Sequence, residues 1–342
     1  MTKTNIAPPG LAVIGCGAWG RNHVKTAAAL GALRGVRDTN PDKASAAAAA
    51  AGVPTLGFDD ILNDDAISGV IIATPDDSHS PLALDALNAG KHVFVEKPMA
   101  TSVADAVRLV DLAKRNGRVL MAGHILLYHP GFLHLCGLVQ GKALGEIRHI
   151  TCQRLHLARR LKRHALWDLA PHDISMVLTL NGKLPTVVRA QAETPVPGVP
   201  PQLVRISLSF ENAPSADISV SAIHPVKLHQ ITLAGSDAFA VFDDTRDWHE
   251  KVSVIRPGLG AYGRDDRPSG TAPALEAVAL QADEPLKAEV RSFLDAIGGG
   301  PMPPSHGGEG LAVVQVLAAA EESLATGEAV SLDRNHHGAL ET

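Results

Sequence analysis

The sequence predicts two fold classes in succession, an α/β domain with a parallel sheet and then an α+β domain with a large, mostly antiparallel, open sheet. In the first third of the 342 residues, short β-branched runs alternate with helical stretches, which is typical of a parallel sheet covered on both faces. After about residue 123, strand-like runs follow one another with few helices between them, which favours antiparallel pairing. We therefore expect one domain over residues 1–123 and another over residues 124–342, whose C-terminal helices could pack back on the first.

Each expected element follows from its hydrophobic pattern. The first domain should contain strands at Leu11–Ile14, Leu33–Arg37, Val70–Ala73, Val93–Val95 and Val119–Ala122, with helices at Arg21–Leu30, Lys43–Ala51, Pro81–Ala89 and Val103–Asn116. The second should contain strands at Ile147–His156, Val187–Glu193, Gln202–Phe210, Asp217–Ile223, Leu228–Ala234, Ala238–Asp243 and Lys251–Ile255, with helices at Pro171–Leu180, Leu286–Ile297 and Glu309–Thr326. We place Pro171 in the first turn of its helix, where a missing N–H costs least.

Composition and charge exclude several classes of function. The net charge of −5 supplies no basic field for a general nucleic-acid or membrane-surface binder. The three cysteines form no CxxC pair, so we expect neither a disulfide framework nor a structural metal site. The N-terminus has no apolar run, and no stretch approaches the roughly 20 apolar residues of a spanning helix, so we expect a soluble, cytoplasmic protein with no membrane partner.

A glycine-rich motif follows the first expected strand. Gly15, Gly17 and Gly20, with Ala18 and Trp19 between the last two, have the form GxGxxG and open a helix. In such motifs the first glycine permits a tight turn, the second lets the backbone approach a pyrophosphate, and the third allows the helix to pack closely on the strand. The phosphates then lie at the helix N-terminus, where free N–H groups favour negative charge. The motif predicts a bound dinucleotide.

An acidic residue stands where the second expected strand ends. Asp38 comes 18 positions after Gly20 and can accept hydrogen bonds from the adenosine ribose hydroxyls while repelling a 2′-phosphate. An ordinary turn residue before Thr39-Asn40-Pro41 is the alternative. Next to the glycine motif, we favour the ribose role and therefore NAD as the cofactor.

Further motifs carry a resemblance to a known family. Ala73-Thr74-Pro75 ends the third expected strand, with His79 four residues on, and Glu96-Lys97-Pro98 ends the fourth. Asp168 and His172 form a later DxxxH. This combination resembles the Gfo/Idh/MocA oxidoreductase family over nearly the whole chain, out to the two closing helices.

The resemblance implies a fold and several residue roles. It implies a Rossmann domain followed by an open sheet, with the substrate between the domains against the nicotinamide. The open sheet face often carries a homo-oligomer contact, so we expect a dimer or tetramer. Thr74, Pro75, His79 and Glu96 are expected at the cofactor. Lys97 is expected both at the cofactor and at the reacting hydroxyl, followed by a proline that is commonly cis.

Two side chains are expected to handle the proton of an alcohol substrate. A partly desolvated lysine beside a positively charged nicotinamide is pushed toward its neutral form, so Lys97 could take the hydroxyl proton. His172 lies four residues after Asp168, about one helical turn, and a neighbouring carboxylate raises the basicity of an imidazole. Asp173 could orient His172 instead, and the sequence leaves this choice open, as it does the choice between Lys97 and His172 as primary base.

The segment before this motif is basic and suggests an anionic substrate. Residues 154–163 contain five Arg or Lys side chains, which either face solvent or bind an anion such as a diphosphate. The run Leu166–Ser175 is similar to the branch of the family that acts on nucleotide sugars, notably UDP-N-acetylglucosamine 3-dehydrogenases, although His164 departs from the asparagine common there. The expected substrate-binding residues are His124, Tyr128, Arg160, Arg163, His164, Trp167 and His172.

In that branch the C3 hydroxyl of UDP-N-acetylglucosamine is oxidised to a ketone. A partner aminotransferase then converts the ketone into the amine of 2,3-diamino sugars for lipid A-type glycolipids. Dehydrogenation of the corresponding uronic acid, or of a free polyol such as an inositol, is the alternative. A non-enzymatic alternative is an NAD-binding regulator, against which the presence of both Lys97 and His172 argues.

Overall fold

The computed structural model describes residues 8–157, 164–194, 196–256, 258–259 and 274–332. Within these ranges the chain divides into two compact units. Unit 1 contains residues 8–125 and 284–314, and unit 2 contains residues 126–283 and 315–332. The segment after residue 283 therefore returns to the unit that the N-terminal half builds.

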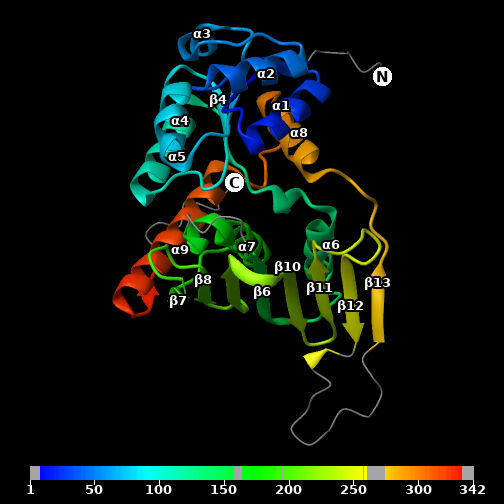
Figure 1. Ribbon diagram of the computed structural model, residues 1–342. Helices are drawn as coiled ribbons and strands as arrows, with labels where there is room; N and C mark the ends of the chain where they lie inside the picture. The colour runs from blue at the N-terminus through cyan, green and yellow to red at the C-terminus, as the bar shows by residue number, and fades with distance from the viewer. Residues whose placement is uncertain (1–7, 158–163, 195, 257, 260–273, 333–342) are drawn as a thin grey trace, which may run out of the picture. The chain divides into compact units, whose positions relative to one another are not determined.

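Unit 1 is built on a parallel sheet of five strands in the order β2-β1-β3-β4-β5. β1, β3 and β5 are buried at every residue, as strands covered on both faces should be. The strands are β1 (Leu11–Ile14), β2 (Leu33–Arg37), β3 (Gly69–Ile72), β4 (His92–Val95) and β5 (Leu120–Ala122). The helices are α1 (Ala18–Ala29), α2 (Pro41–Ala51), α3 (Phe58–Asn63), α4 (His79–Asn88), α5 (Val103–Asn116) and α8 (Pro285–Ile297), labelled in Figure 1.

The expected elements of unit 1 all form, with small shifts at their ends. α2 begins two residues earlier than expected because the Asn40 side chain accepts hydrogen bonds from the N–H groups of Asp42 and Lys43 and caps the helix. The short helix α3 was not expected. At six residues it is too short to show a helical period, and its capping contact is the N–H of Gly57 donating to Asp60.

Unit 2 is built on a sheet of nine strands in the order β13-β12-β11-β10-β6-β9-β8-β7-β14 (Figure 1). The neighbours pair antiparallel except β6 and β9, which run parallel. The strands are β6 (Ile147–Leu157), β7 (Val187–Glu193), β8 (Leu203–Ser209), β9 (Ser215–Ser221), β10 (Ile223–Gly235), β11 (Phe239–Asp243), β12 (Val252–Arg256), β13 (Ala274–Val278) and β14 (Val330–Ser331). This confirms the predicted, mostly antiparallel sheet; β13 and β14 were not expected.

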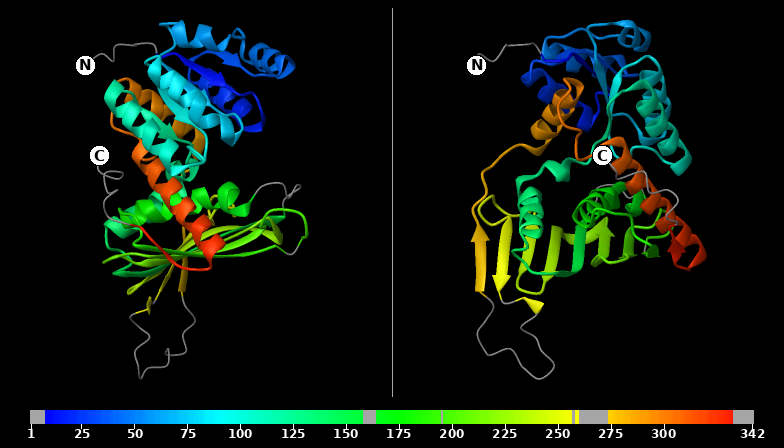
Figure 2. Two further views of the ribbon diagram at one scale, coloured as in Figure 1. Left: turned by 90° about the vertical axis from the view of Figure 1, so that its left-hand side faces the viewer. Right: turned by 180° about the vertical axis from the view of Figure 1, so that it is seen from behind.

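Helices cover one face of this sheet. α6 (Pro130–Gln140), α7 (Ala165–Asn181) and the C-terminal part of α9 (Gly307–Thr326) lie on it, and the opposite face carries no helix in the part of the chain that the structure describes (Figure 2). Residues of β8 alternate between buried and exposed accordingly. No helix among the described residues combines the length and apolar character needed to cross a bilayer.

The predicted start of α7 at Pro171 was wrong. The helix begins six residues earlier, at Ala165, and Pro171 lies inside it. The ring of His164 accepts a hydrogen bond from the Leu166 N–H at 3.1 Å and caps the helix. A proline inside a helix costs about 3 kcal/mol, and the buried face of α7, which includes Leu166 and Ile174, offsets that cost.

Candidate functional site

Two of the three glycines of the GxGxxG motif are required by close contacts in the structure, and the third faces open space. Gly15 has φ +96°, and a Cβ there would lie 2.4 Å from the carbonyl oxygen of Ala73. A Cβ on Gly20 would lie 1.8 Å from the Gly15 carbonyl oxygen, so α1 can approach the turn only because Gly20 lacks a side chain. A Cβ on Gly17 would meet nothing within 4 Å, which leaves the helix N-terminus uncovered. This open N-terminus fits a pyrophosphate.

Asp38 lies directly beside the glycine loop. Its Oδ2 accepts the N–H of Cys16 at 2.7 Å, and its Oδ1 accepts the N–H of Asn40 at 2.8 Å. Each carboxylate oxygen has a second lone pair left for another donor. Burial and the Asp38 charge raise the pKa of the Cys16 thiol to about 11, so that this thiol stays protonated. Asp38 is thus a turn residue whose carboxylate is fixed by two backbone N–H groups and can still accept hydrogen bonds from a ribose.

His79 connects the ends of β3 and β4. Its ring is buried, with Nδ1 2.8 Å from the carbonyl oxygen of Pro98 and Nε2 2.9 Å from that of Thr74. A neutral ring can donate to only one of them at a time. Because Pro98 directly follows Lys97, this contact holds the segment that carries the lysine. The Lys97–Pro98 peptide bond is cis. His79 therefore has a positioning contact that its place in the sequence did not indicate.

Glu96 points into unit 1 rather than to its surface. Its Oε1 lies 2.7 Å from Nε2 of His23 on α1, and its Oε2 accepts the backbone N–H of Lys97 at 3.2 Å. Burial raises the pKa of Glu96, but the hydrogen bond and charge of His23, together with the Lys97 charge, more than reverse this and lower it. Glu96 is thus ionised and fixes the backbone of Lys97, which is half-buried.

His124, which we expected in the substrate pocket, pairs with a carboxylate. Its Nδ1 lies 2.6 Å from Oε2 of Glu309 on α9, and both side chains are almost fully buried. Tyr128 is also buried, at 7% exposed. Pro75 is exposed at the end of β3, as are Ala18 and Trp19 at the start of α1. No sequence pattern indicated the His124–Glu309 pair, because its members are 185 residues apart.

In unit 2, α7 carries Asp168 and His172 about one helical turn apart. The neighbouring Asp173 binds an arginine. Nε of Arg154 on β6 donates to Asp173 Oδ2 at 2.8 Å, and both side chains are more than nine-tenths buried. The anion that Arg154 binds is therefore internal. Asp173 is thus held by Arg154, and the pairing of Asp168 with His172 stays a prediction.

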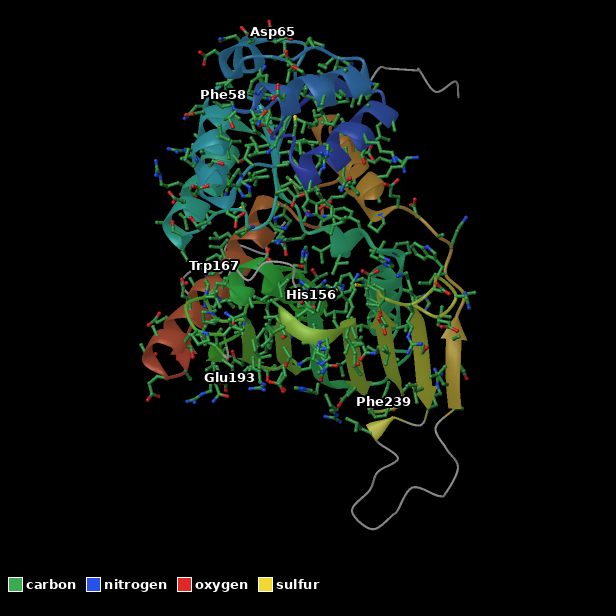
Figure 3. All side chains as sticks on the ribbon, viewed as in Figure 1. Phe58, Asp65, His156, Trp167, Glu193 and Phe239 are labelled. Atoms are coloured by element: carbon green, nitrogen blue, oxygen red, sulfur yellow. The ribbon has the colours of Figure 1, made fainter. Side chains whose placement is uncertain are left out.

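Two further histidines on the helix-covered face were not singled out. His156 on β6, labelled in Figure 3, and His229 on β10 have ring centroids 6.2 Å apart. The charge of Asp168 acts on His156, which places these rings near the start of α7. Burial, with the Arg154 charge, lowers the pKa of His229 to about 3, and burial also lowers that of His156. Both rings are neutral at pH 7, so each can donate or accept a hydrogen bond.

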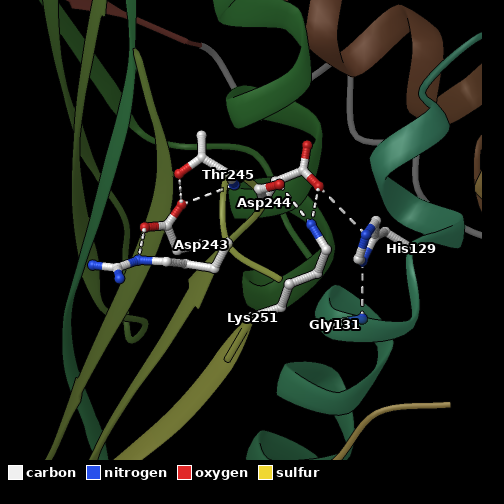
Figure 4. Close-up of polar contacts among 7 residues, drawn as sticks. His129, Gly131, Asp243, Asp244, Thr245 and Lys251 are labelled. Atoms are coloured by element: carbon white, nitrogen blue, oxygen red, sulfur yellow. Dashed lines mark hydrogen bonds and ion pairs between the residues drawn. The ribbon is translucent and has the colours of Figure 1, made fainter. Parts of the chain in front are cut away.

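Two other expected substrate residues of unit 2, Trp167 and His164, have structural contacts. The Trp167 indole donates to Glu321 on α9 at 3.1 Å (Figure 3 labels Trp167), and His164 caps α7. His129, beside Tyr128, accepts the N–H of Gly131 and lies 3.4 Å from Asp244 (Figure 4). Arg160 and Arg163 lie outside the described residues.

Comparisons with known proteins cover both units. A model described as an oxidoreductase family with an NAD-binding Rossmann fold matches residues 10–124, and one described as the C-terminal alpha/beta domain of that family matches residues 138–332.

The relatives include sugar dehydrogenases. The chain is 29% identical to UDP-N-acetylglucosamine 3-dehydrogenase of Acidithiobacillus ferrooxidans over 83% of this chain and 87% of that protein. A solved structure of that enzyme has a TM-score of 0.81 at 26% identity and covers 92% of this chain and 96% of its own. Inositol 2-dehydrogenase 2 of Saccharopolyspora erythraea is 31% identical over 54% of this chain and 57% of its own.

The open helix N-terminus and the held Asp38 carboxylate fit the cofactor that the matching model describes. The chain therefore belongs to the Gfo/Idh/MocA family of oxidoreductases, and residues 10–124 form its NAD-binding Rossmann domain.

Proposed function

We propose that this protein oxidises the C3 hydroxyl of UDP-N-acetylglucosamine to a ketone with NAD as hydride acceptor. The similarity to UDP-N-acetylglucosamine 3-dehydrogenase, which extends over most of both chains, carries the proposal. The local geometry supports it, because each unit presents one half of the required chemistry. Unit 1 has the dinucleotide cradle and Lys97, and unit 2 has His172 with its neighbouring polar side chains.

The protein's part is to hold the reactants and move one proton. Bound NAD supplies the hydride acceptor, and the carbon that loses hydride becomes a ketone as its hydroxyl loses a proton. We assign removal of that proton to His172, with Asp168 supporting the imidazolium that forms, and assign Lys97 to the same hydroxyl. Glu96 and His79 hold the backbone on either side of Lys97. Thr74, Pro75, Gly15, Gly17, Ala18, Trp19, Gly20 and Asp38 complete the proposed cofactor contacts.

His156 and His229 are proposed as additional substrate contacts. As neutral rings they can bind sugar hydroxyls in either hydrogen-bonding sense, which an imidazolium cannot. His124, Tyr128, His164 and Trp167 stay as proposed substrate residues, although for His124, His164 and Trp167 the contacts described above are structural. Arg160 and Arg163 are the proposed diphosphate contacts.

The ketone product suggests the reaction that follows. An aminotransferase can convert a 3-keto sugar into the 3-amino sugar while its amino-acid donor becomes a keto acid, so we propose that such an enzyme consumes the product on the route to 2,3-diamino sugars of the lipid A type. We also propose that the protein works in the cytoplasm as a homo-oligomer, a dimer or a tetramer.

A free polyol is the second candidate substrate, and the similarity to an inositol dehydrogenase favours it. The test is NADH formation with UDP-N-acetylglucosamine, its uronic acid, free N-acetylglucosamine and myo-inositol, each with an aminotransferase and amine donor present or absent. We expect NADH only with the UDP-linked sugars and an increase when the aminotransferase removes the ketone. Turnover of inositol, with none on the UDP sugars, would replace the first proposal with the second.

A further inference from the structure

A buried ion pair joins helix α7 to the sheet of unit 2. Nε of Arg154 donates to Oδ2 of Asp173 at 2.8 Å, and Nη2 of Arg154 donates to Oδ1 at 3.4 Å. Arg154 is 6% exposed and Asp173 is fully buried. Asp173 directly follows His172, the residue to which we assign removal of the substrate's proton. The pair therefore lies one residue from the proposed base.

The strand end of this pair is fixed. Arg154 belongs to β6, which lies inside the nine-stranded sheet between β9 and β10. It is in register with Val220 of β9 and with His229 of β10. A residue held by strands on both sides opens rarely, because the whole sheet must loosen to release it. Arg154 is therefore a fixed point against which α7 can be oriented.

The helix end is held less firmly by its own backbone. Pro171 has no N–H, so the carbonyl group of Trp167 does not receive the hydrogen bond that it would have in a regular helix. The hydroxyl of Ser175 donates to the carbonyl oxygen of His172 at 2.9 Å, a contact that often bends helices. Both departures fall in or beside the turn that carries Asp168 and His172, so this turn needs support from outside the helix.

Stability alone does not explain why that support is an ion pair. The desolvation of two charges can exceed their attraction, and apolar side chains of similar volume often replace a buried pair without loss of stability. Burial raises the pKa of Asp173, and the charge and hydrogen bond of Arg154 oppose that rise. What the pair adds to apolar packing is direction, because two N–H groups in one guanidinium plane donate to a carboxylate in a preferred orientation.

Direction matters for His172 because it shares a helical turn with Asp173. A side-chain atom lies roughly 5–6 Å from the axis of a helix, so a rotation of α7 by about 10° moves it by about 1 Å. Apolar contacts are non-directional and tolerate such a rotation, whereas the hydrogen bonds to Arg154 do not. A misplacement of about 1 Å can lower the rate of a reaction about a hundredfold.

We propose that Arg154 and Asp173 are positioning residues, which fix the rotation of α7 about its axis and thereby place the His172 ring. Neither residue touches substrate or cofactor in this proposal. The predicted effect on turnover rests on the proposed function of His172; the predicted effect on the helix does not.

The first test replaces the pair by apolar side chains. Arg154→Met/Asp173→Leu leaves no buried charge, so its urea midpoint should recover most of what Arg154→Met alone loses. Its kcat should nevertheless stay about tenfold to a hundredfold below that of the wild type, with the Kd for NAD unchanged, because α7 has lost its directional contact. Asn181→Ala is the matched control. It removes the hydrogen bond to the Pro214 carbonyl oxygen at the other end of the same helix and should keep full kcat.

A double variant with both the urea midpoint and the kcat of the wild type would overturn the proposal, because the pair would then contribute packing only. If the double variant does not fold or does not recover its midpoint, Arg154→Lys decides. Lysine keeps a positive charge beside Asp173 but offers a point donor in place of the planar fork. Its kcat should fall about tenfold or more. Wild-type kcat in this variant would refute the need for a directional contact.

The second test needs no substrate. Backbone hydrogen exchange, measured by mass spectrometry on peptides of α7, compares the double variant, or Arg154→Lys in its place, with the wild type. Amides of residues 166–173 should exchange several-fold faster in the variant and at the wild-type rate in Asn181→Ala. Unchanged exchange in the variant would refute a role of the pair in fixing this turn. Absence of turnover in the wild type on every sugar tested would count against the proposed function alone, since the exchange result would stand.

Discussion

The conversion of Asp38 to asparagine tests how the cofactor is recognised. In the structure each carboxylate oxygen accepts one backbone N–H, from Cys16 at 2.7 Å and from Asn40 at 2.8 Å. An asparagine offers a single acceptor oxygen, so one of these N–H groups would face an amide NH₂. The side chain also becomes neutral, so the ribose hydroxyls, which we assign to the remaining lone pairs of Asp38, lose a charged acceptor.

The two losses appear in different measurements. An N–H left without an acceptor costs about 1–3 kcal/mol. That cost falls on the folded protein with or without cofactor, so it lowers stability and not affinity. A hydrogen bond to a charged group is worth about 1.5–3 kcal/mol, which corresponds to roughly a 10- to 100-fold weaker Kd for NAD. The Kd for NADP should change less or improve, because the charge that repels its 2′-phosphate is gone.

Calorimetric titration of the variant and the wild type with NADH and with NADPH measures the change in affinity for each cofactor. Urea denaturation without cofactor measures the loss of stability. Asp85→Asn on the exposed side of α4 removes the same charge elsewhere in unit 1 and should leave both Kd values unchanged. An Asp38→Asn protein that binds NAD within about twofold of the wild type, with its preference over NADP intact, would refute the ribose role.

Four further changes test the rest of the site. Lys97→Met and His172→Asn should each lower kcat by roughly 10²–10⁴-fold with NAD binding retained, measured by NADH formation and by titration. Arg154→Met should lower the free energy of unfolding by about 3–5 kcal/mol in urea denaturation, since it leaves the Asp173 carboxylate buried without its guanidinium. Burial lowers the pKa of His129 in the folded protein to about 4, from an ordinary value of 6.5. Between these two pH values the unfolded chain binds a proton that the folded protein does not, so stability is lost as pH falls from about 6.5 to about 4. His129→Gln should flatten the dependence of thermal stability on pH in that window by up to about 1.4 kcal/mol per pH unit.

The Lys97, His172 and Arg154 changes each have a matched control on an exposed residue. Lys114→Met and His249→Asn should keep full turnover, and Arg205→Met should unfold like the wild type. Normal kcat in the Lys97 or His172 variant would remove that residue from the mechanism. Wild-type stability of Arg154→Met would mean that the buried ion pair contributes no net free energy. An unchanged pH profile in His129→Gln would mean that another group titrates there.

The sequence by itself determined the cofactor half of the protein. Its glycine motif lies within one strand–helix–strand segment, β1-α1-β2, and Asp38 directly follows that segment. In a parallel sheet the carboxyl ends of the strands meet at one edge, so local order already predicts which residues come together. The strand pattern of the second half likewise predicted an antiparallel sheet, although the parallel pairing of β6 with β9 is not visible in it.

The tertiary structure alone decided which buried polar groups are partners. It paired Asp173 with Arg154, His124 with Glu309, and Glu96 with His23, and it showed that α7 begins before Pro171. The physical reason is the same in each case. A buried charge or ring must find a partner through packing between elements distant in the chain, and neither hydrophobic period nor motif spacing records where that packing brings it.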